Sequence, residues 1–406
     1  MARIFPWSVF LRIAYFTESL PPLTDGVART YTRLAETLNE DGHDFLFICP
    51  MTPAEPEPWR GRVIQVPSVP FPLYKYYRVG LPNPFRLDPI LDKFQPDLIQ
   101  VAAPTPLCLY GQNYANRRKI PTIASYHTHF VDYFPYYGYA WAVNGGWRWM
   151  RWCYNRSRLT FVPTPGAIAE LTERGFKGVR RWPRGIDGSK FSPKFRSPEL
   201  RQKLGVGDEP LLLFVGRMVG EKDLQDLADA SVILRSQGYK FRLAFAGDGP
   251  YRPIMQEQLP QDFFGGFIEG QPLADLYASS DLFVFPSTTE TFGNVILEAF
   301  ASGLPVVGVK KGGVADLVVD GQNGFLSIPK DPADFAEKIK TLLDQPDLCK
   351  HLSEGALQTA ASYNWLTINR KLIEEGAQLV RENPRSKPSP KPLPLSGVEA
   401  AKLANG

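Results

Sequence analysis

The stretch FPSTTETFGNVILEAFASGLPVV, residues 285–307, decides the fold of this 406-residue chain. Its pattern predicts an apolar strand that ends at Phe285, a polar loop, a helix that begins near Thr291, a stop at Gly303 and a second apolar strand. Strands that alternate with helices form parallel sheets. We therefore predict an α/β protein.

Two carboxylates flank the start of this predicted helix. Glu290 precedes the helix, and Glu298 lies eight residues further on, which is about 12 Å at roughly 1.5 Å per residue. Gly293 would let a ligand approach the first-turn amides, which attract anions such as phosphate together with the helix dipole. An anion site with a hydroxyl-binding carboxylate at either end suits a sugar joined through a diphosphate to a nucleoside.

The same alternation occurs in both halves of the chain. Apolar runs occupy residues 11–16, 44–48, 62–66, 98–101, 122–125 and 159–162 in the first half, and 211–215, 241–246, 263–267, 281–285 and 305–308 in the second. Ligands of such sheets bind beyond the carboxyl ends of the strands. We predict two Rossmann-like parallel-sheet domains that face each other across an interdomain cleft.

Changes in composition predict the domain boundaries. We expect an N-terminal domain over residues 1–185, a linker rich in Pro, Gly and charge over 186–203, a C-terminal domain over 204–362, a helix over 363–382 that returns to the N-terminal domain, and a disordered Pro-rich tail over 383–406.

Composition places the chain among ordinary globular proteins, with 44% hydrophobic and 22% charged residues. The net charge of +4 fits an anionic substrate or an acidic membrane surface, and requires neither. The four cysteines form no Cys-x-x-Cys pair, which favours structural thiols in a reducing compartment. The chain has no apolar run of 18 residues, and its apolar N-terminus carries Pro6 without a small-residue cleavage site. We expect a cytoplasmic protein with neither a membrane-spanning helix nor a signal peptide.

A second candidate site follows the predicted strand at 211–215. Gly216 ends that strand, and Arg217 and Lys222 precede the next helix. The two cations could neutralise a diphosphate leaving group, whose developing negative charge opposes cleavage of a glycosidic C–O bond. An isolated pair of this kind is more often part of a solvated loop.

Two loops in the first half carry further candidates. Gly26 stands before a helix, where backbone amides could meet a phosphate or sugar oxygen, although such loops are often simple turns. His127, in Ser125-Tyr-His-Thr-His129, could bind a substrate hydroxyl or be a structural histidine. Because no further ligand follows at metal spacing, we predict no metal site. No complete G-x-G-x-x-G or Walker loop occurs, which argues against nicotinamide enzymes and NTPases.

Aromatic residues and arginines alternate over residues 133–158. This composition suits a membrane interface or a sugar-stacking pocket, and it also suits a helix packed into the core or a dimer contact. Nucleic acid is a poor match, because the charge is modest and no binding module is present.

The motifs together resemble the retaining GT-B glycosyltransferases of family 4 over residues 11–380. The resemblance rests on Glu290-x7-Glu298 with AFASGLPVV after it, on Gly216-Arg217 with Lys222, on AGDGP at 246–250, and on Arg184-Gly-Ile-Asp187 with Phe191 and Pro193. Within the family, ESLPPLTDGV at 18–27 and SYHTH at 125–129 look most like the sulfoquinovosyltransferase and lipid mannosyl- or glucosyltransferase branch.

The resemblance implies a role for each candidate residue. Arg217 and Lys222 would hold the donor diphosphate, Glu290 the transferred sugar, Glu298 the ribose hydroxyls, and His127 the sugar from the first domain. Further donor contacts would come from Gly26, Gly216, Gly249, Phe292, Gly293 and Asn294. The first domain would be the acceptor side, and the second would bind the nucleotide sugar.

The implied activity is retaining, metal-independent transfer of a hexose from a UDP- or GDP-linked sugar to an acceptor hydroxyl. The acceptor would be a lipid or glycolipid, and the donor is a substrate, so no cofactor is expected. Peripheral contact with the cytoplasmic face of a membrane fits this activity. A non-catalytic GT-B scaffold that binds nucleotide sugars and a GT-B sugar-nucleotide epimerase are the alternatives. Two departures concern the ligand contacts: Asp25 precedes Gly26 where the family often has Gly-Gly, and Asp316 stands where many relatives carry Glu.

Overall fold

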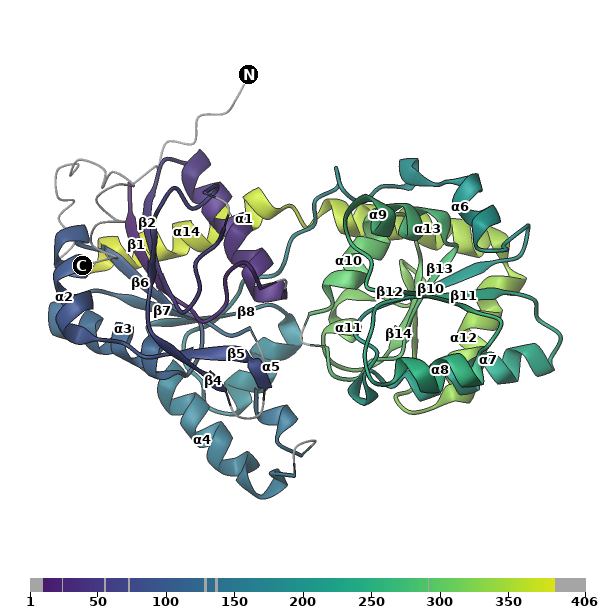
Figure 1. Cartoon of the computed structure of the whole chain (residues 1–406), viewed down its shortest axis with the longest axis horizontal. Coiled ribbons are helices and arrows are strands. Elements are labelled where there is room, and N and C mark those ends of the chain that lie inside the picture. Colours follow the sequence, from purple (N-terminus) through teal and green to yellow (C-terminus); the bar gives the residue numbers. More distant parts are fainter. Residues whose placement is uncertain are drawn as a thin grey trace. The chain divides into compact units, whose positions relative to one another are not determined.

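The computed structural model describes residues 10–23, 25–54, 56–71, 74–127, 130–135, 138–290 and 292–383. The chain divides into two compact units, each with its own sheet (Figure 1). Unit 1 comprises Met1–Trp182 and Leu366–Gly406, and unit 2 comprises Pro183–Trp365.

Unit 1 contains a seven-stranded sheet in the order β3-β2-β1-β6-β7-β8-β9, and every pair in it is parallel. The strands are β1 Arg12–Phe16, β2 Asp44–Cys49, β3 Val63–Gln65, β6 Leu98–Val101, β7 Thr122–Ser125, β8 Leu159–Val162 and β9 Val179–Arg181. Six of them match predicted apolar runs. The edge strand β9 was missed, because two of its three residues are exposed arginines.

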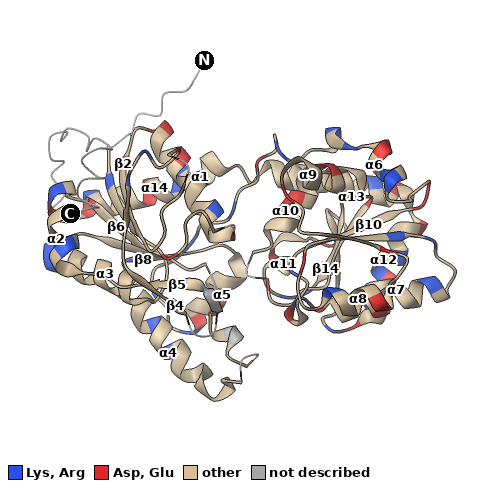
Figure 2. Ribbon diagram, viewed as in Figure 1, with Lys and Arg blue, Asp and Glu red and all other residues tan. Residues whose placement is uncertain are grey.

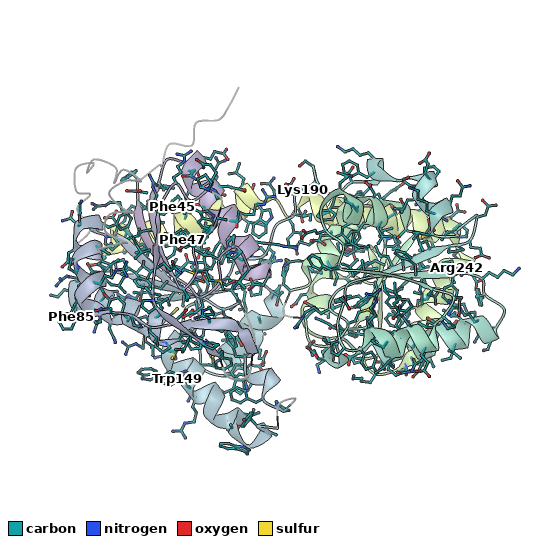
Figure 3. The ribbon with its side chains drawn as sticks, in the orientation of Figure 1. Phe45, Phe47, Phe85, Trp149, Lys190 and Arg242 are labelled. Carbon is teal, nitrogen blue, oxygen red and sulfur yellow. The ribbon has the colours of Figure 1, made fainter. Side chains whose placement is uncertain are left out.

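Both faces of this sheet are buried, which explains its continuous apolar strands. Ala14 and Phe16 of β1 join the core on one face, whereas Tyr15 joins the core on the other. Phe45 and Phe47 alternate in the same way with Leu46 and Ile48 along β2 (Figure 3). The period of two residues along each strand therefore fills two separate cores.

The helices described in unit 1 are α1 Gly26–Glu40, α2 Pro84–Phe94, α3 Pro106–Arg118, α4 Val143–Tyr154, α5 Pro165–Glu173 and α14 Trp365–Glu382, of which all but Trp365 lies in unit 1. Polar side chains cap several N-termini, namely Asp25, Asn83, Thr105 and Thr164. A two-stranded antiparallel sheet, β4 Ser68–Phe71 with β5 Tyr74–Gly80, and the short 3-10 turns η1 Phe130–Tyr133 and η3 Ala140–Ala142 complete the unit.

Unit 2 contains a six-stranded parallel sheet in the order β12-β11-β10-β13-β14-β15. Its strands are β10 Leu211–Val215, β11 Arg242–Ala246, β12 Phe263–Gly266, β13 Leu282–Phe285, β14 Val306–Val309 and β15 Gly324–Ser327. The prediction of a parallel sheet in each half of the chain is thus confirmed. Only β15, at the edge, lacks a predicted counterpart.

The helices of unit 2 are α6 Pro198–Lys203, α7 Leu224–Ser236, α8 Arg252–Gln258, α9 Gly270–Ser279, α10 Asn294–Ala301, α11 Gly312–Leu317, α12 Pro332–Asp344 and α13 Pro346–Ala361. The 3-10 turns η4 Pro193–Phe195 and η5 Gly220–Lys222 belong to the same unit. Charges of both signs are interspersed over these outer helices (Figure 2), as on an ordinary solvated surface.

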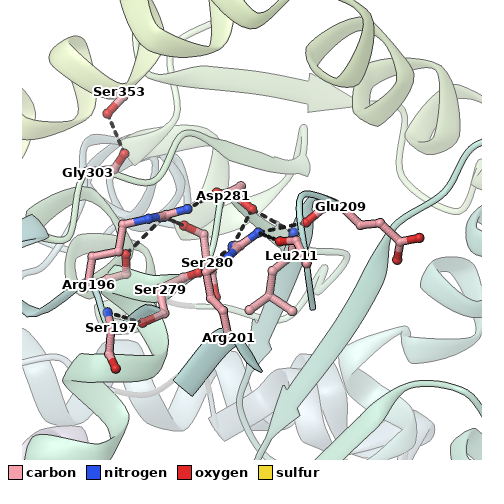
Figure 4. Close-up of polar contacts among 12 residues, drawn as sticks. Arg196, Ser197, Arg201, Glu209, Leu211, Ser279, Ser280, Asp281, Gly303 and Ser353 are labelled. Atoms are coloured by element: carbon pink, nitrogen blue, oxygen red, sulfur yellow. Dashed lines mark hydrogen bonds and ion pairs between the residues drawn. The ribbon is translucent and has the colours of Figure 1, made fainter. Parts of the chain in front are cut away.

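The segment expected to be a linker, residues 186–203, is grouped with unit 2. Arg196 and Arg201 both donate to the carboxylate of Asp281, at 2.7 and 2.8 Å (Figure 4). The same carboxylate accepts from the amide of Leu211 at 2.8 Å, at the start of β10. The charges that suggested a solvated linker instead bind the segment to the sheet.

Helix α14 places the end of the described chain in unit 1. The buried amide of Asn369 donates to the carbonyl of Arg33 and the hydroxyl of Thr37, both at 3.1 Å, and its oxygen accepts from the indole of Trp182 at 3.2 Å. Gly376 packs so closely on β6 that an added Cβ would lie 2.7 Å from Leu98 Cδ2. Of the predicted tail, residues 384–406 lie outside the described residues.

Helix α4 divides the aromatic and arginine stretch between core and solvent. Trp147, Met150, Cys153 and Tyr154 are buried against unit 1. Trp149 and Trp152 are exposed and stacked, with ring centroids 5.2 Å apart, and Trp149 extends from the helix in Figure 3. In the preceding turn η3, Trp141 is 82% exposed. One face of α4 is therefore core, and the opposite face carries aromatic side chains on the surface.

No helix in the described part of the chain combines the length and apolarity that crossing a bilayer requires.

Candidate active site

The order of the strands in unit 2 marks a place for a ligand. β10 lies between β11 and β13, so the chain leaves β10 to one side of the sheet and later returns to the other. In parallel sheets, ligands bind beyond the carboxyl ends of the strands at such a switch point. The two loops that meet there follow β10 and β13, and they contain the predicted residues Lys222 and Glu290.

Lys222 ends the short turn η5 and is only 9% exposed. Its ammonium group forms an ion pair with the carboxylate of Glu290 and lies 5.9 Å from the centroid of the Phe285 ring. A lysine is rarely so enclosed unless its charge has a partner. The structure therefore brings together the two residues expected to hold phosphate and sugar.

The backbone of Glu290 is held by the loop that precedes α11. Its carbonyl oxygen accepts a hydrogen bond from the amide of Gly313 at 2.8 Å. At Gly312, which has φ +58°, an added Cβ would lie 2.7 Å from the same oxygen. A side chain at position 312 would be strained and would push this loop away from Glu290.

A third charged residue in this cluster, Asp223, was missed from the sequence. Its backbone is left-handed at φ +55°, and its side chain is buried. The carboxylate accepts from the amide of Thr288 at 2.9 Å and from its hydroxyl at 2.7 Å, and it also pairs with Lys330. Asp223 thus ties the Lys222 loop to the loop that carries Glu290. An Asp directly after the candidate lysine was the only signal in the sequence.

Arg217 differs from Lys222 in its surroundings. Its side chain is 58% exposed and pairs with Glu221 at 3.6 Å. Exposed pairs of this type contribute little to stability. Arg217 therefore lies on the same loop as Lys222 but is accessible, and its role towards phosphate stays a prediction.

The glycines of the predicted donor site bring two loops together. The amide of Gly216 donates to Ala246 O at 3.0 Å. A Cβ at Gly249 would lie 2.3 Å from Met218 O. Gly249 is therefore required for the close packing of the loops after β10 and β11, whatever else it contacts.

Helix α10 begins at Asn294, with Gly293 as its N-cap, three residues later than predicted. Phe292 is buried and meets Tyr363 edge-on, with the ring centroids 6.1 Å apart. Thr291, the predicted start, lies outside the described residues. Gly293 is left-handed at φ +90°, so the regular helix begins only after it.

Glu298 lies within α10 and is buried. The hydroxyl of Tyr277 is 3.0 Å from its Oε2 and 3.2 Å from Val295 O. The tyrosine therefore helps to fix the carboxylate of Glu298 within unit 2. The contact of Glu298 with ribose stays a prediction.

Gly26 and His127 belong to unit 1. Gly26 is the first residue of α1, whose N-cap Asp25 accepts from the amides of Val27 and Ala28. His127 follows β7, and its Nε2 is 3.3 Å from the hydroxyl of Tyr31. His129, the second histidine of the motif, lies outside the described residues. Among the residues that the structure describes, no group of three or more His, Cys, Asp or Glu could hold a metal ion.

A buried carboxyl, Glu18, lies at the corresponding switch point of unit 1 and was also missed. It follows β1, which pairs with β2 on one side and β6 on the other. The side chain is 1% exposed, and Cys108 Sγ, in α3 after β6, is 3.8 Å from its Oε2. Burial raises the pKa of Glu18 to about 7, and the side chains of Thr105 and Cys108 reduce that rise.

Comparison with known proteins identifies the family. The model described as Glycosyltransferase Family 4 matches residues 24–190, and Glycosyl transferases group 1 matches residues 196–359. A GDP-mannose-dependent alpha-mannosyltransferase of Corynebacterium glutamicum is 33% identical over 407 residues, which cover 97% of this chain and 94% of the relative. The chain belongs to the family 4 glycosyltransferases.

Two other relatives are similar to this family 4 glycosyltransferase over most of its length. The sulfoquinovosyl transferase SQD2 of Arabidopsis thaliana is 32% identical over 90% of this chain and 73% of its own length. The alpha-monoglucosyldiacylglycerol synthase of Streptococcus pneumoniae is 31% identical over 86% of this chain and 83% of its own length. The predicted resemblance to this branch of the family is confirmed.

Solved structures share the fold of the family 4 glycosyltransferase. The sucrose-phosphate synthase of Thermosynechococcus elongatus has a TM-score of 0.75 at 22% identity, over 92% of this chain and all of its own. HepE of Anabaena, crystallised with UDP, has a TM-score of 0.73 at 21% identity, over 91% of this chain and all of its own. With two parallel sheets and these neighbours, the GT-B fold class is confirmed.

Proposed function

We propose that this chain transfers a hexose from a nucleotide-diphospho-sugar to a hydroxyl of a lipid or glycolipid, with retention at the anomeric carbon. The observation that carries the proposal is the pairing of Lys222 with Glu290 at the switch point of unit 2. A cation for phosphate and a carboxylate for sugar hydroxyls are in contact where a ligand of this sheet would bind. Unit 2 is accordingly the donor side, and unit 1 the acceptor side.

In this proposal the residues of unit 2 stabilise the leaving group. The bond between the anomeric carbon and the diphosphate oxygen breaks, and the acceptor oxygen forms the new bond as its proton passes to the leaving phosphate. Lys222 and Arg217 bear the negative charge that develops on the diphosphate, so no metal is needed. Glu290 orients the sugar, and Glu298 accepts from ribose hydroxyls.

The backbone contributes the remaining donor contacts. Amides at Phe292, Gly293 and Asn294 support the phosphate at the start of α10. Gly216 and Gly249 have no side chains, so the ligand can approach the backbone of the loops after β10 and β11. From unit 1, Gly26 and His127 meet the phosphate and the sugar.

The class of acceptor rests on the relatives. One of them is a monoglucosyldiacylglycerol synthase and another a sulfoquinovosyl transferase, and several use GDP-mannose. These names favour a lipid acceptor and leave both UDP and GDP as candidate bases of the donor.

A donor panel tests this proposal. The purified chain should release nucleotide from one UDP- or GDP-sugar, and dioleoylglycerol or extracted lipid should increase the release at least tenfold while a glycolipid appears. EDTA should leave the rate unchanged. Release that no acceptor accelerates, with isomerised donor as the product, would indicate an epimerase, and binding without turnover would indicate a scaffold.

A surface of unit 1 is suited to an anionic membrane. The exposed aromatics Trp141, Trp149 and Trp152 accompany Arg148 and Arg151 on and beside α4. No Asp or Glu occurs between residues 133 and 169. Indole rings lie well at the level of lipid headgroups, and arginines bind acidic headgroups there. We propose that this surface, named the α4 surface, docks on anionic lipid.

The membrane proposal predicts a loss of vesicle binding. Replacing Trp141, Trp149 and Trp152 together by alanine should weaken binding to phosphatidylglycerol vesicles at least tenfold, because the apolar area that enters the interface is lost. Co-sedimentation at low salt measures the change. Phe267→Ala, at an exposed position of unit 2, is the matched control and should bind as the wild type does. Equal binding of the triple variant and the control would show that the α4 surface does not bind anionic lipid.

A further inference from the structure

Glu18 is a buried carboxyl that the proposed donor site does not use. Its Oε1 has no hydrogen-bond partner among the described residues, although the atom is shielded from solvent. A buried polar atom without a partner destabilises the fold, so natural structures retain few of them without a reason. The orphaned oxygen of Glu18 therefore points to a ligand that completes it.

The position of Glu18 agrees with such a ligand. It is the second residue after β1, beyond the carboxyl end of the strand at the switch point between β2 and β6. Thr105 and Cys108, which lie near its carboxyl, belong to the start of α3 after β6. This is where a parallel sheet binds its ligand, and it corresponds in unit 1 to the place of Lys222 in unit 2.

The surroundings of Glu18 favour a neutral, hydroxyl-bearing group over a cation or an anion. Besides Glu18 itself, the charged residue that acts on the nearby Cys49 thiol and Tyr77 phenol is Asp25. The carboxylate of Asp25 already accepts a hydrogen bond from the hydroxyl of Ser19 at 2.8 Å. Burial raises the pKa of the Cys49 and Cys108 thiols and of the Tyr77 phenol, so these groups stay neutral between pH 6 and 8. Among the described residues, no cation acts on the Glu18 carboxyl, so a phosphate would have no charge partner there.

We infer that Glu18 binds a hydroxyl of the acceptor in unit 1. The inference rests on the proposed function, because it assigns the acceptor to this unit. The acceptor hydroxyl donates to Oε1, which supplies the missing partner. The side chain is enclosed without a ligand, so the contact forms by rotation of Glu18 or of its neighbours.

The substitution Glu18→Gln tests the inference because it preserves the shape of the side chain. With dioleoylglycerol in mixed micelles as the hydroxyl probe, kcat/KM for transfer should fall about tenfold at pH 8, where the wild-type group is ionised and its hydrogen bond is stronger. At pH 6, where the wild-type group is protonated, the two proteins should differ less than twofold. Hydrolysis of the donor in the absence of acceptor should be unchanged at both pH values.

The control is Glu36→Gln, which removes an exposed carboxylate of α1 in the same unit. It should leave transfer and donor hydrolysis as in the wild type at both pH values. If Glu18→Gln reduces transfer and hydrolysis by equal factors, or reduces neither, Glu18 is only structural and the inference is overturned. A wild-type chain that transfers nothing to any lipid acceptor would instead overturn the proposed function, so the two failures are distinct.

Discussion

Replacing Lys222 by alanine is expected to lower donor turnover by about two to three orders of magnitude. The ammonium group of Lys222 is enclosed beside Glu290 and Phe285, whereas Arg217 on the same loop is 58% exposed and would compensate only in part. The negative charge on the departing diphosphate then develops without its main partner. The loss should appear in kcat, because that charge is greatest in the transition state.

Nucleotide release from the preferred donor measures the effect of Lys222→Ala, with far-ultraviolet circular dichroism to show that the fold persists. Lys340→Ala is the matched control, since Lys340 lies on α12 of the same unit and pairs only at the surface with Glu337. Glu290→Ala should also be strongly impaired. If both variants turn the donor over at the wild-type rate, the assignment of the site to unit 2 is wrong.

The strands and the main site could be predicted because both depend on local patterns. Strands buried on both faces, such as β1 and β10, are continuous apolar runs that need no knowledge of the fold. Lys222 and Glu290 follow such strands, and parallel order brings those loops together. Their contact therefore follows from the parallel order of the strands, which the alternation of strands and helices in the sequence predicts.

Other features depend on partners far away in the sequence. Residues 196–201 have the composition of a linker, and hydrogen bonds to residues 278–281, some 80 residues later, make them part of unit 2. Glu18 is one acidic residue after a strand, and its importance follows from complete burial and an oxygen without a partner. Neither contact has a local pattern that a sequence could display.

Asp223 follows a residue that the sequence singled out, but its partners Thr288 and Lys330 lie far away in the chain. Replacing Asp223 by alanine should lower the free energy of unfolding by about 4 kcal/mol. The amide and the hydroxyl of Thr288 would lose their acceptor in a buried site, at about 1–3 kcal/mol each. A further 1 kcal/mol or so arises because alanine tolerates the left-handed backbone less well than aspartate does. For a unit of the size of unit 2, Pro183–Trp365, a loss of that order lowers the melting temperature of the unit by roughly 10 °C.

Two further variants separate these causes when thermal unfolding is followed by calorimetry. Asp223→Asn keeps an acceptor for Thr288 and a residue that accepts the left-handed conformation, so it should retain more than half of the stability lost in Asp223→Ala. Lys330→Ala removes the ion pair and keeps the bonds between Asp223 and Thr288, and because Lys330 is 62% exposed it should cost less than about 1 kcal/mol. If Lys330→Ala is as harmful as Asp223→Ala, the ion pair and not the bonds to Thr288 joins the Lys222 and Glu290 loops. If Asp223→Ala is much more harmful than Lys330→Ala, Asp223 acts through its bonds to Thr288. These bonds then fix the position of Glu290, two residues after Thr288.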